Sequence, residues 1–198
     1  MKLPLPTWEG NVSVEQAIKQ RRTIRRYASR ALTADQLSQM LWAAGGITEN
    51  KGYKRAAPSA GALYPMDLYV VAGEGGVASL EAGIYHYEPG KHGLSPAAQG
   101  DMRSLVAQAS LSQMWMANAP LCMVITAEYS RVMGKYGRRG IRYAMIEAGH
   151  MGQNIFLQAR ALGLDAGIVG AFDDNTLIKV MGIPTAHEPL LVMPVGYR

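Results

Sequence analysis

The stretch IRYAMIEAGHMGQNIFLQARALG, residues 141–163, repeats small or apolar residues at spacings of three and four along its whole length. These residues are Ile141, Met145, Ala148, Gly152, Ile155, Ala159 and Leu162. Such spacing places them on one face of a helix. Gly149 and Gly152 each lower helix propensity by roughly 1 kcal/mol relative to alanine, so we expect close backbone contacts to compensate. The stretch predicts the central buried helix of the fold and leaves open that it lies at a subunit interface.

Shorter elements are predicted on both sides of this helix. Capping boxes at Ser13–Gln16 and Thr33–Gln36 begin two earlier helices, the first over about 14–22 and the second ending at Gly45-Gly46. Residues 47–65 are rich in Gly, Lys, Pro and Ser and predict a long functional loop. Further helices are expected over 101–110 and 176–181, and strands over 68–71, 84–87, 121–126 and 190–195. Because strands and helices do not alternate strictly, residues 1–198 are interpreted as a single α+β domain rather than a doubly wound parallel sheet.

The composition limits the class of protein. Of the 198 residues, 48% are hydrophobic and 18% are charged, which is enough to bury a core and excludes general disorder. The single cysteine, Cys122, excludes an internal disulfide framework, and its apolar neighbours predict an inert core thiol. A signal peptide and an apolar run of membrane-spanning length are both missing, so we expect a cytoplasmic protein without a membrane partner. No metal site is expected, because ligand spacing is lacking at His86, His92, His150 and His187.

The densest group of charges consists of arginines, in a chain with a net charge of +5. It comprises Arg21, Arg22, Arg25, Arg26 and Arg30, where the first predicted helix ends. Three interpretations are open: a solvated surface, a phosphate clamp with Thr23 as an added hydroxyl donor, and a nucleic-acid patch. Guanidinium groups match phosphate oxygens in fork geometry. A nucleic-acid patch would need interleaved aromatic residues, and Tyr27 alone provides little support.

Two further segments consist mainly of small residues. APSAGALYP, residues 57–65, leaves its backbone accessible, which suits a flat ring lying against the main chain. GIVGAFDD, residues 167–174, spaces two glycines ahead of a helix start, and its amides could point at an electronegative ring atom. Taken alone, the first is equally an ordinary loop and the second a strand-to-helix connection.

Six motifs in order carry a resemblance to a known family. They are Arg21–Tyr27, Pro58–Pro65, Lys135–Tyr143, Glu147–His150 with Gln153 and Asn154, Val169–Asp174, and Pro194–Arg198. In this order they resemble the flavin-dependent nitroreductase family, and most closely its SagB-type branch, whose relatives oxidise peptide azolines to azoles. The resemblance covers the chain from about residue 13 to residue 198.

The resemblance implies a nitroreductase-like fold, with a central, mostly antiparallel sheet flanked by helices. It also implies an intertwined homodimer that binds FMN at the subunit interface. The phosphate and ribityl end of FMN would be held by Arg21, Arg22, Thr23 and Arg198. Arg25 would lie near the pyrimidine edge of the ring, where a cation stabilises the anionic reduced flavin.

The same resemblance implies how the flavin ring is enclosed. From the partner subunit, the ring would be covered by Pro58, Ser59, Ala60 and Gly61. Behind the ring would pass Ile168, Val169, Gly170 and Ala171, with the Gly170 amide within reach of flavin N5. Typical nitroreductases have a second Ser, an Asn and a Gln at the places of Ala60, Ala62 and Tyr64, and a Glu at the place of Gly170. These departures match the SagB-type branch and put the ordinary ring contacts in question.

Lys135-Tyr136 resembles the Lys-Tyr pair that serves proton abstraction in azoline dehydrogenases. The alternative is a solvated lysine beside a packed tyrosine.

The residues and the resemblance leave three functions open. The first is ping-pong hydride transfer from NAD(P)H through FMN to an oxidised acceptor such as a nitroaromatic or a quinone. The second is a SagB-type dehydrogenase that oxidises a bound substrate with Lys135 and Tyr136 as the base. The third, and most remote, is a basic nucleic-acid-binding domain.

Overall fold

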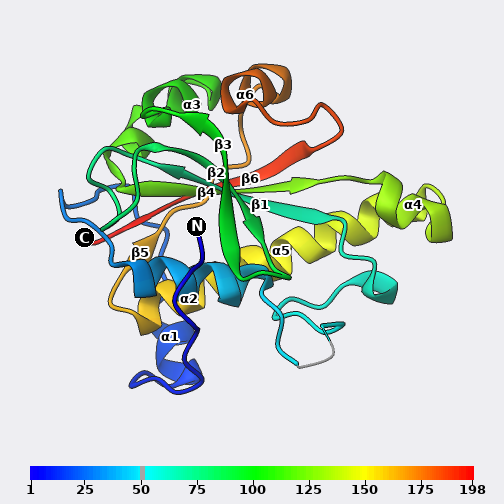
Figure 1. Cartoon of the computed structure of the whole chain (residues 1–198), viewed down its shortest axis with the longest axis horizontal. Coiled ribbons are helices and arrows are strands. Elements are labelled where there is room, and N and C mark those ends of the chain that lie inside the picture. The colour runs from blue at the N-terminus through cyan, green and yellow to red at the C-terminus, as the bar shows by residue number, and fades with distance from the viewer. Residues whose placement is uncertain (50–51) are drawn as a thin grey trace.

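The computed structural model describes residues 1–49 and 52–198, so residues 50 and 51 of the predicted loop lie outside the described residues. One antiparallel sheet forms the centre of the fold, with the strand order β3-β2-β1-β4-β6-β5. Helices cover both of its faces (Figure 1). The strands are β1 Met66–Ala72, β2 Gly83–Glu88, β3 Gly93–Gln99, β4 Leu121–Ala127, β5 Asp165–Ala166 and β6 Glu188–Gly196. The predicted α+β class and the mostly antiparallel sheet are confirmed.

The four predicted strands are present and longer than expected. β1 and β4 are buried along their whole lengths, because helices pack on both faces of the sheet. Cys122 in β4 is fully buried, and burial raises the pKa of its thiol to about 12, as expected of an inert core residue. β3 and β5 were not predicted. β3 contains Pro96 and several small residues, and β5 is only two residues long, so neither has a strand pattern of its own.

Successive side chains of a strand point to opposite faces, so each face of the sheet has its own core. On one face pack α2 (Ala34–Gly45) and α5 (Arg139–Ala161), with α1 (Val14–Gln20) beside α5. Leu41 of α2 and Ile155 of α5 are fully buried there with Met123. On the other face, α3 (Arg103–Ala109) and α6 (Asp174–Met181) cover Val124 and its neighbours (Figure 1).

The long helix α5 has a buried face and an open face. Gly152 allows a close approach, because a Cβ there would lie 3.2 Å from Leu191 of β6. Gly149 has no neighbour within 4 Å, so the expected close contact is wrong for this glycine within one chain. Met145, placed on the buried face by its spacing, is 53% exposed, and Ile146 is 50% exposed. The helix is therefore buried against the sheet but open along the side that carries these residues.

Local hydrogen bonds explain where the helices begin. The Thr33 capping box is complete, and Ser13 and Asp173 accept bonds from the amides three residues ahead. α1 ends at Gln20 rather than near residue 22, because Arg21 has an extended ψ of 127°. Helix α4 (Ser130–Tyr136) was not predicted; no side chain caps its start. Among the described residues, none of the helices is long and apolar enough to cross a membrane.

Candidate functional site

The arginine-rich stretch runs along the edge of the sheet. Thr23 pairs in parallel with Ala166 of β5, and the amide of Ile24 donates to the carbonyl oxygen of Ala166 at 3.0 Å. Gly167 follows at once, and a Cβ there would lie 2.8 Å from the carbonyl oxygen of Ile24. Glycine is therefore required for the two segments to meet. The fold brings together two motifs that lie some 140 residues apart in the sequence.

Aromatic rings hold the guanidinium groups of this stretch. Arg21 Cζ lies 5.1 Å from the centre of the Phe156 ring, and Arg25 Cζ lies 5.7 Å from that of Trp115. Arg22 donates to the carbonyl oxygens of Lys19 and Arg21 at 2.9 and 2.7 Å, so part of the hydrogen-bonding capacity of its guanidinium group is used at the end of α1. Within the part of the chain that the structure describes, Arg21, Arg22 and Arg25 form no ion pair. They are cations available to an anionic ligand.

The segment Gly167–Ala171 presents its backbone to the same surface. Val169 pairs with Val192 of β6 through both of its backbone bonds, at 2.8 and 2.9 Å. Beyond this bridge Gly170 and Ala171 are exposed, and their amides donate to no other described residue. A Cβ at Gly170 would meet only one atom within 4 Å, the carbonyl oxygen of Leu190 at 3.9 Å. Both amides therefore lack a partner among the described residues, and the space beside the Gly170 Cα is open.

Two more predicted regions reach this surface. Trp115 belongs to the short helix η2 (Met114–Asn118), and its ring would contact a Cβ at Gly167 at 2.9 Å. The amide of Ala28 donates to the carbonyl oxygen of Tyr197 at 2.8 Å, which places the exposed Arg198 beside the arginine-rich stretch. We call this surface, comprising Arg21–Arg25, Trp115, Gly167–Ala171 and Arg198, the arginine half.

A second group of predicted residues gathers elsewhere. Gly61 lies in the short helix η1 (Ala60–Ala62) at a φ of 63°, and a Cβ there would lie 2.7 Å from the hydroxyl of Tyr136 and 3.1 Å from Lys135 Nζ. Tyr136 also packs edge-on against Tyr143, with ring centres 5.2 Å apart. The fold thus joins the Lys-Tyr pair to the small-residue loop, which the sequence could not show. We call Pro58–Gly61, Lys135, Tyr136, Tyr143 and Glu147 the covering half.

The two halves do not meet within one chain. Helix α5 carries Glu147 of the covering half and Phe156, which stacks on Arg21 of the arginine half. These two positions are nine residues apart on the helix, which corresponds to about 14 Å at 1.5 Å per residue.

Glu147 was not singled out as a site residue by the sequence, where it stands only within a family motif. It is 3% exposed, and its Oε2 atom has no hydrogen-bond partner among the described residues. Burial raises its pKa to about 7, and the nearby Ser59 hydroxyl and Arg55 guanidinium oppose that rise only in part. A buried carboxyl that titrates near neutrality can exchange a proton at physiological pH. In the sequence, Glu147 could be found only by its position in the predicted central helix. Its burial is visible only in the fold.

A charged network near the ends of β1 and β4 was also missed. Asp67, in β1, is 8% exposed. It contacts Arg131 at 2.8 Å and His86 at 2.8 Å, and Arg131 also reaches Glu128 at 2.6 Å. Asp67, Glu128 and His187 offer ligand atoms within 4.8 Å of one another. The Arg131 guanidinium already supplies the positive charge between the two carboxylates, so we interpret this network as structural.

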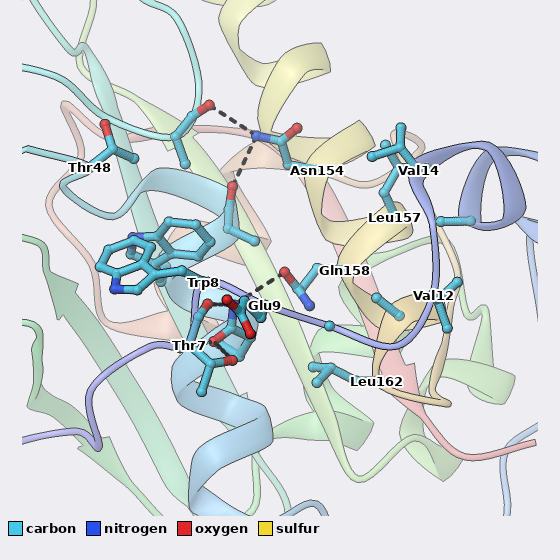
Figure 2. Close-up of a pocket in the computed structure, with 17 residues that line it drawn as sticks. Thr7, Trp8, Glu9, Val12, Val14, Thr48, Asn154, Leu157, Gln158 and Leu162 are labelled. Carbon is cyan, nitrogen blue, oxygen red and sulfur yellow. Dashed lines mark hydrogen bonds between the residues drawn. The ribbon is translucent and has the colours of Figure 1, made fainter.

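Another cavity lies away from both halves. It has a volume of about 510 Å³ between the N-terminal arm, α1, α2 and α5. Figure 2 shows Asn154 donating to the carbonyl oxygens of Ala43 and Ala56 at its wall, at 3.0 and 3.3 Å. Trp8 packs edge-on against Trp42 beside it, with ring centres 5.1 Å apart. None of the predicted site residues is among the described residues that line this cavity.

Comparisons with known proteins support the resemblance drawn from the sequence. A model of the nitroreductase family matches residues 18–197. MJ1384 of Methanocaldococcus jannaschii, which carries a nitroreductase name, is 40% identical over 198 residues, covering 100% of this chain and 97% of its own length. The microcin B17-processing protein McbC of Escherichia coli is 30% identical over 147 residues, 72% of this chain and 54% of McbC.

Solved structures agree with these matches. A structure from Ralstonia eutropha with a nitroreductase name superposes with a TM-score of 0.85 at 27% identity, over 99% of this chain and 88% of that one. The E. coli microcin synthetase McbBCD complex, solved with truncated pro-MccB17 bound, contains a chain that superposes with a TM-score of 0.77 at 25% identity. That match covers 97% of this chain and 75% of the other.

Proposed function

Because the chain belongs to the nitroreductase family, we propose that it is an FMN-dependent oxidoreductase that works as a homodimer. The observation that carries the proposal is the arginine half, where cations without carboxylate partners lie beside the free amides of Gly170 and Ala171. Guanidinium groups suit a phosphate, and free amides suit electronegative ring atoms. The open space at Gly170 fits a flat ring lying against the main chain.

Each part of the arginine half has a proposed task. The phosphate and ribityl end would be bound by Arg21, Arg22, Thr23 and Arg198. Arg25, held against Trp115, would place its charge near the pyrimidine edge. Behind the ring would lie Ile168, Val169, Gly170 and Ala171, kept in place by the Val169–Val192 bridge. The bridge is rigid because it uses both backbone bonds, so the Gly170 amide can be aimed at one ring atom.

The covering half of the second subunit would close the site. Its ring-covering residues would be Pro58, Ser59, Ala60 and Gly61. FMN, when bound, supplies two-electron hydride chemistry. We propose NAD(P)H as the donor and a nitroaromatic or a quinone as the acceptor, bound in turn at the same site. The chain's own residues would then bind the ring, shield one face of it and supply protons.

The experiment that tests this function is spectroscopic. The purified protein should carry the visible absorption of a flavin, and anaerobic mixing with NADPH should bleach it. A protein that neither retains nor takes up FMN would contradict the cofactor, and bound flavin that stays oxidised with both NADPH and NADH would contradict the donor.

We expect Arg21→Ala and Arg25→Ala to weaken FMN binding. A charge-assisted hydrogen bond is worth about 1.5–3 kcal/mol, which corresponds to a rise in Kd of roughly 10- to 150-fold. Titration of the apoproteins with FMN measures this. Arg26→Ala is the matched control, because Arg26 is exposed in the same stretch and has no proposed contact. Wild-type affinity in both site variants would overturn the clamp.

A specific observation favours a second function. Lys135 and Tyr136 lie against Gly61 in the covering half, and two of the curated relatives, McbC and the trifolitoxin-processing protein TfxB, are named as processing proteins. A SagB-type dehydrogenase would use this pair as a base that removes a proton from a bound substrate while the ring takes a hydride. The alternative thus keeps the same cofactor site and reverses the direction of electron flow.

Lys135→Ala separates the two directions. If the pair is a base, anaerobic reduction of bound flavin by a synthetic azoline peptide should slow by about 100-fold or more in the variant, the usual range for a lost general base. Reduction by NADPH should be unchanged, because hydride donation from NADPH needs no base. Lys54→Ala, at an exposed lysine outside both halves, serves as the control. Equal azoline rates in wild type and Lys135→Ala would remove the base assignment.

A further inference from the structure

Glu147 lies between two cavities. The outer one has a volume of about 260 Å³ and is lined by the covering segment Pro58–Ala60 and by α5 residues including Tyr143 and His150. The inner one has a volume of about 70 Å³ and is lined by Arg55, Tyr64 and other polar residues. Glu147 lines both. Its carboxyl group is therefore placed to connect an interior polar space with the surface that would cover the cofactor.

The carboxyl group has no fixed partner for its Oε2 atom. That atom is buried and accepts no hydrogen bond from any described residue. An ionised carboxylate left in this way is costly, whereas a neutral, protonated carboxyl group is buried at a much lower cost. Burial accordingly raises the pKa of Glu147 to about 7. The titratable and charged groups that share its cavities are Arg55, Tyr64, Asp67, Tyr87, Arg131, Tyr143 and His150.

Ser59 belongs to the covering half and lines the same outer cavity as Glu147. Its Oγ accepts a hydrogen bond from the amide of Tyr64 at 2.9 Å. A hydroxyl that accepts from an amide keeps its own proton free to donate. The Ser59 hydroxyl is also close enough to the Glu147 carboxyl group to favour its ionised form, which lowers the pKa of Glu147. One proton can thus move from the carboxyl group to the hydroxyl while another leaves the hydroxyl.

We propose that Glu147 supplies protons through the Ser59 hydroxyl to the acceptor that is reduced at the covering half. The inference rests on the proposed function, since it needs an acceptor on the ring. Two-electron reduction of a quinone to a hydroquinone consumes one hydride and one additional proton. The hydride comes from NAD(P)H by way of the cofactor. Glu147 is then a positioning residue that acts on the acceptor through Ser59.

The proton steps balance. As an acceptor oxygen gains negative charge, the O–H bond of Ser59 breaks and a new O–H bond forms on the acceptor. The O–H bond of Glu147 breaks and restores the Ser59 hydroxyl, which leaves a carboxylate. Water then returns one proton to Glu147; the inner cavity, at about 70 Å³, is large enough to hold water. The net change is one proton taken from solvent.

The first arm of the test needs no cofactor. In the folded chain Glu147 keeps its proton up to a pH of about 7, whereas in the unfolded chain it loses it near its usual pKa of about 4.3. Unfolding between these values releases a proton, so the unfolding constant of wild type should rise by up to about tenfold per pH unit relative to Glu147→Gln. Denaturant unfolding from pH 4.5 to 8.5 measures this, with Glu81→Gln as the exposed control.

The second arm follows reoxidation of the reduced flavoprotein by a quinone at each pH. Wild type should slow above about pH 7, as Glu147 loses its proton. Glu147→Gln should be at least about tenfold slower and nearly independent of pH. Ser59→Ala should react like Glu147→Gln while keeping the pH-dependent unfolding of wild type, because its Glu147 still titrates.

The outcomes are distinct. A flavin-loaded Glu147→Gln protein with the rate and pH profile of wild type would overturn the relay. So would equal pH dependence of unfolding in wild type and Glu147→Gln. A wild-type protein that takes up no flavin would instead contradict the proposed function, and the relay would fall with it. The unfolding experiment would still show the pH range in which Glu147 titrates.

Discussion

Two variants that each fail to retain FMN should regain one cofactor per dimer when they are combined in a heterodimer. One variant, Arg21→Ala with Arg22→Ala, damages only the arginine half. The other, Pro58→Glu, damages only the covering half by adding a bulky negative charge to an exposed position. If each site takes one half from each subunit, the heterodimer has one site with both defects and one with none. The expected loading is one FMN per two chains.

The physical reason is the separation along α5. Glu147 of the covering half and Phe156, which stacks on Arg21 of the arginine half, are about 14 Å apart on one helix, which is why we propose that the two halves of one chain serve different sites. Co-expression with two different tags and sequential affinity purification isolates the heterodimer, and flavin absorbance per chain gives the loading.

The matched control pairs two defects in the same half. A heterodimer of the double arginine variant with Arg25→Ala has a damaged arginine half in both sites and should show no gain over its parents. Failure of the Pro58→Glu heterodimer to exceed both parents would contradict a site shared between subunits.

Asp67→Ala should produce the largest loss of stability among single charge deletions discussed above. Asp67 is 8% exposed and contacts His86 and Arg131, both at 2.8 Å. Removing one partner of a buried pair leaves the others uncompensated, which costs about 3–5 kcal/mol. Because the Arg131 side chain is 35% exposed, we expect a value near the lower end, about 3 kcal/mol.

The same network predicts a pH dependence. Burial alone would raise the pKa of Asp67, yet the hydrogen bond from His86 and the positive charge of Arg131, with electrostatic interactions from His187 and His86, hold it below its usual value. The folded-state pKa is thus depressed, so the stabilisation is present above the unfolded pKa and is lost as the pH falls through the folded pKa. The stability gap between wild type and Asp67→Ala should accordingly narrow at acid pH.

Urea unfolding at neutral and acid pH measures both effects. Glu88→Gln is the control, since it breaks an ion pair with Lys91 whose lysine side chain is 79% exposed, and such pairs contribute little. An Asp67→Ala protein as stable as wild type at neutral pH would show that the network is not stabilising.

The arginine-rich stretch fits a cofactor site better than a nucleic-acid interface. The nucleic-acid interpretation rested on charge alone, and the structure instead stacks Arg21, Arg25 and Arg30 on single aromatic rings beside the sheet edge. Stacking limits where each guanidinium can point. A cofactor with one phosphate fits such fixed cations better than a long polyanion, which is bound mainly by cations that follow its backbone.

Much of this fold could be predicted from the sequence, because its signals are local. The helix caps at Ser13, Thr33 and Asp173 act over three residues, and the apolar runs of β1 and β4 mark buried strands without reference to the rest of the chain. The order of six motifs likewise identified the family. Strand β5 was not predicted, because two residues of strand leave too little local pattern, and helix α4 was missed as well.

The tertiary structure alone decided which predicted residues share a surface. Thr23 meets Ala166, and Lys135 and Tyr136 meet Gly61, through pairings between distant segments that no local pattern encodes. Burial of Glu147 and Asp67 depends on what the sheet and helices pack against them, so their titration could not be read from residue type. The length of α5 keeps the two halves apart, because a helix is rigid along its axis. Sequence periodicity revealed the helix, and only its packing showed that the covering half and the arginine half lie apart within one chain.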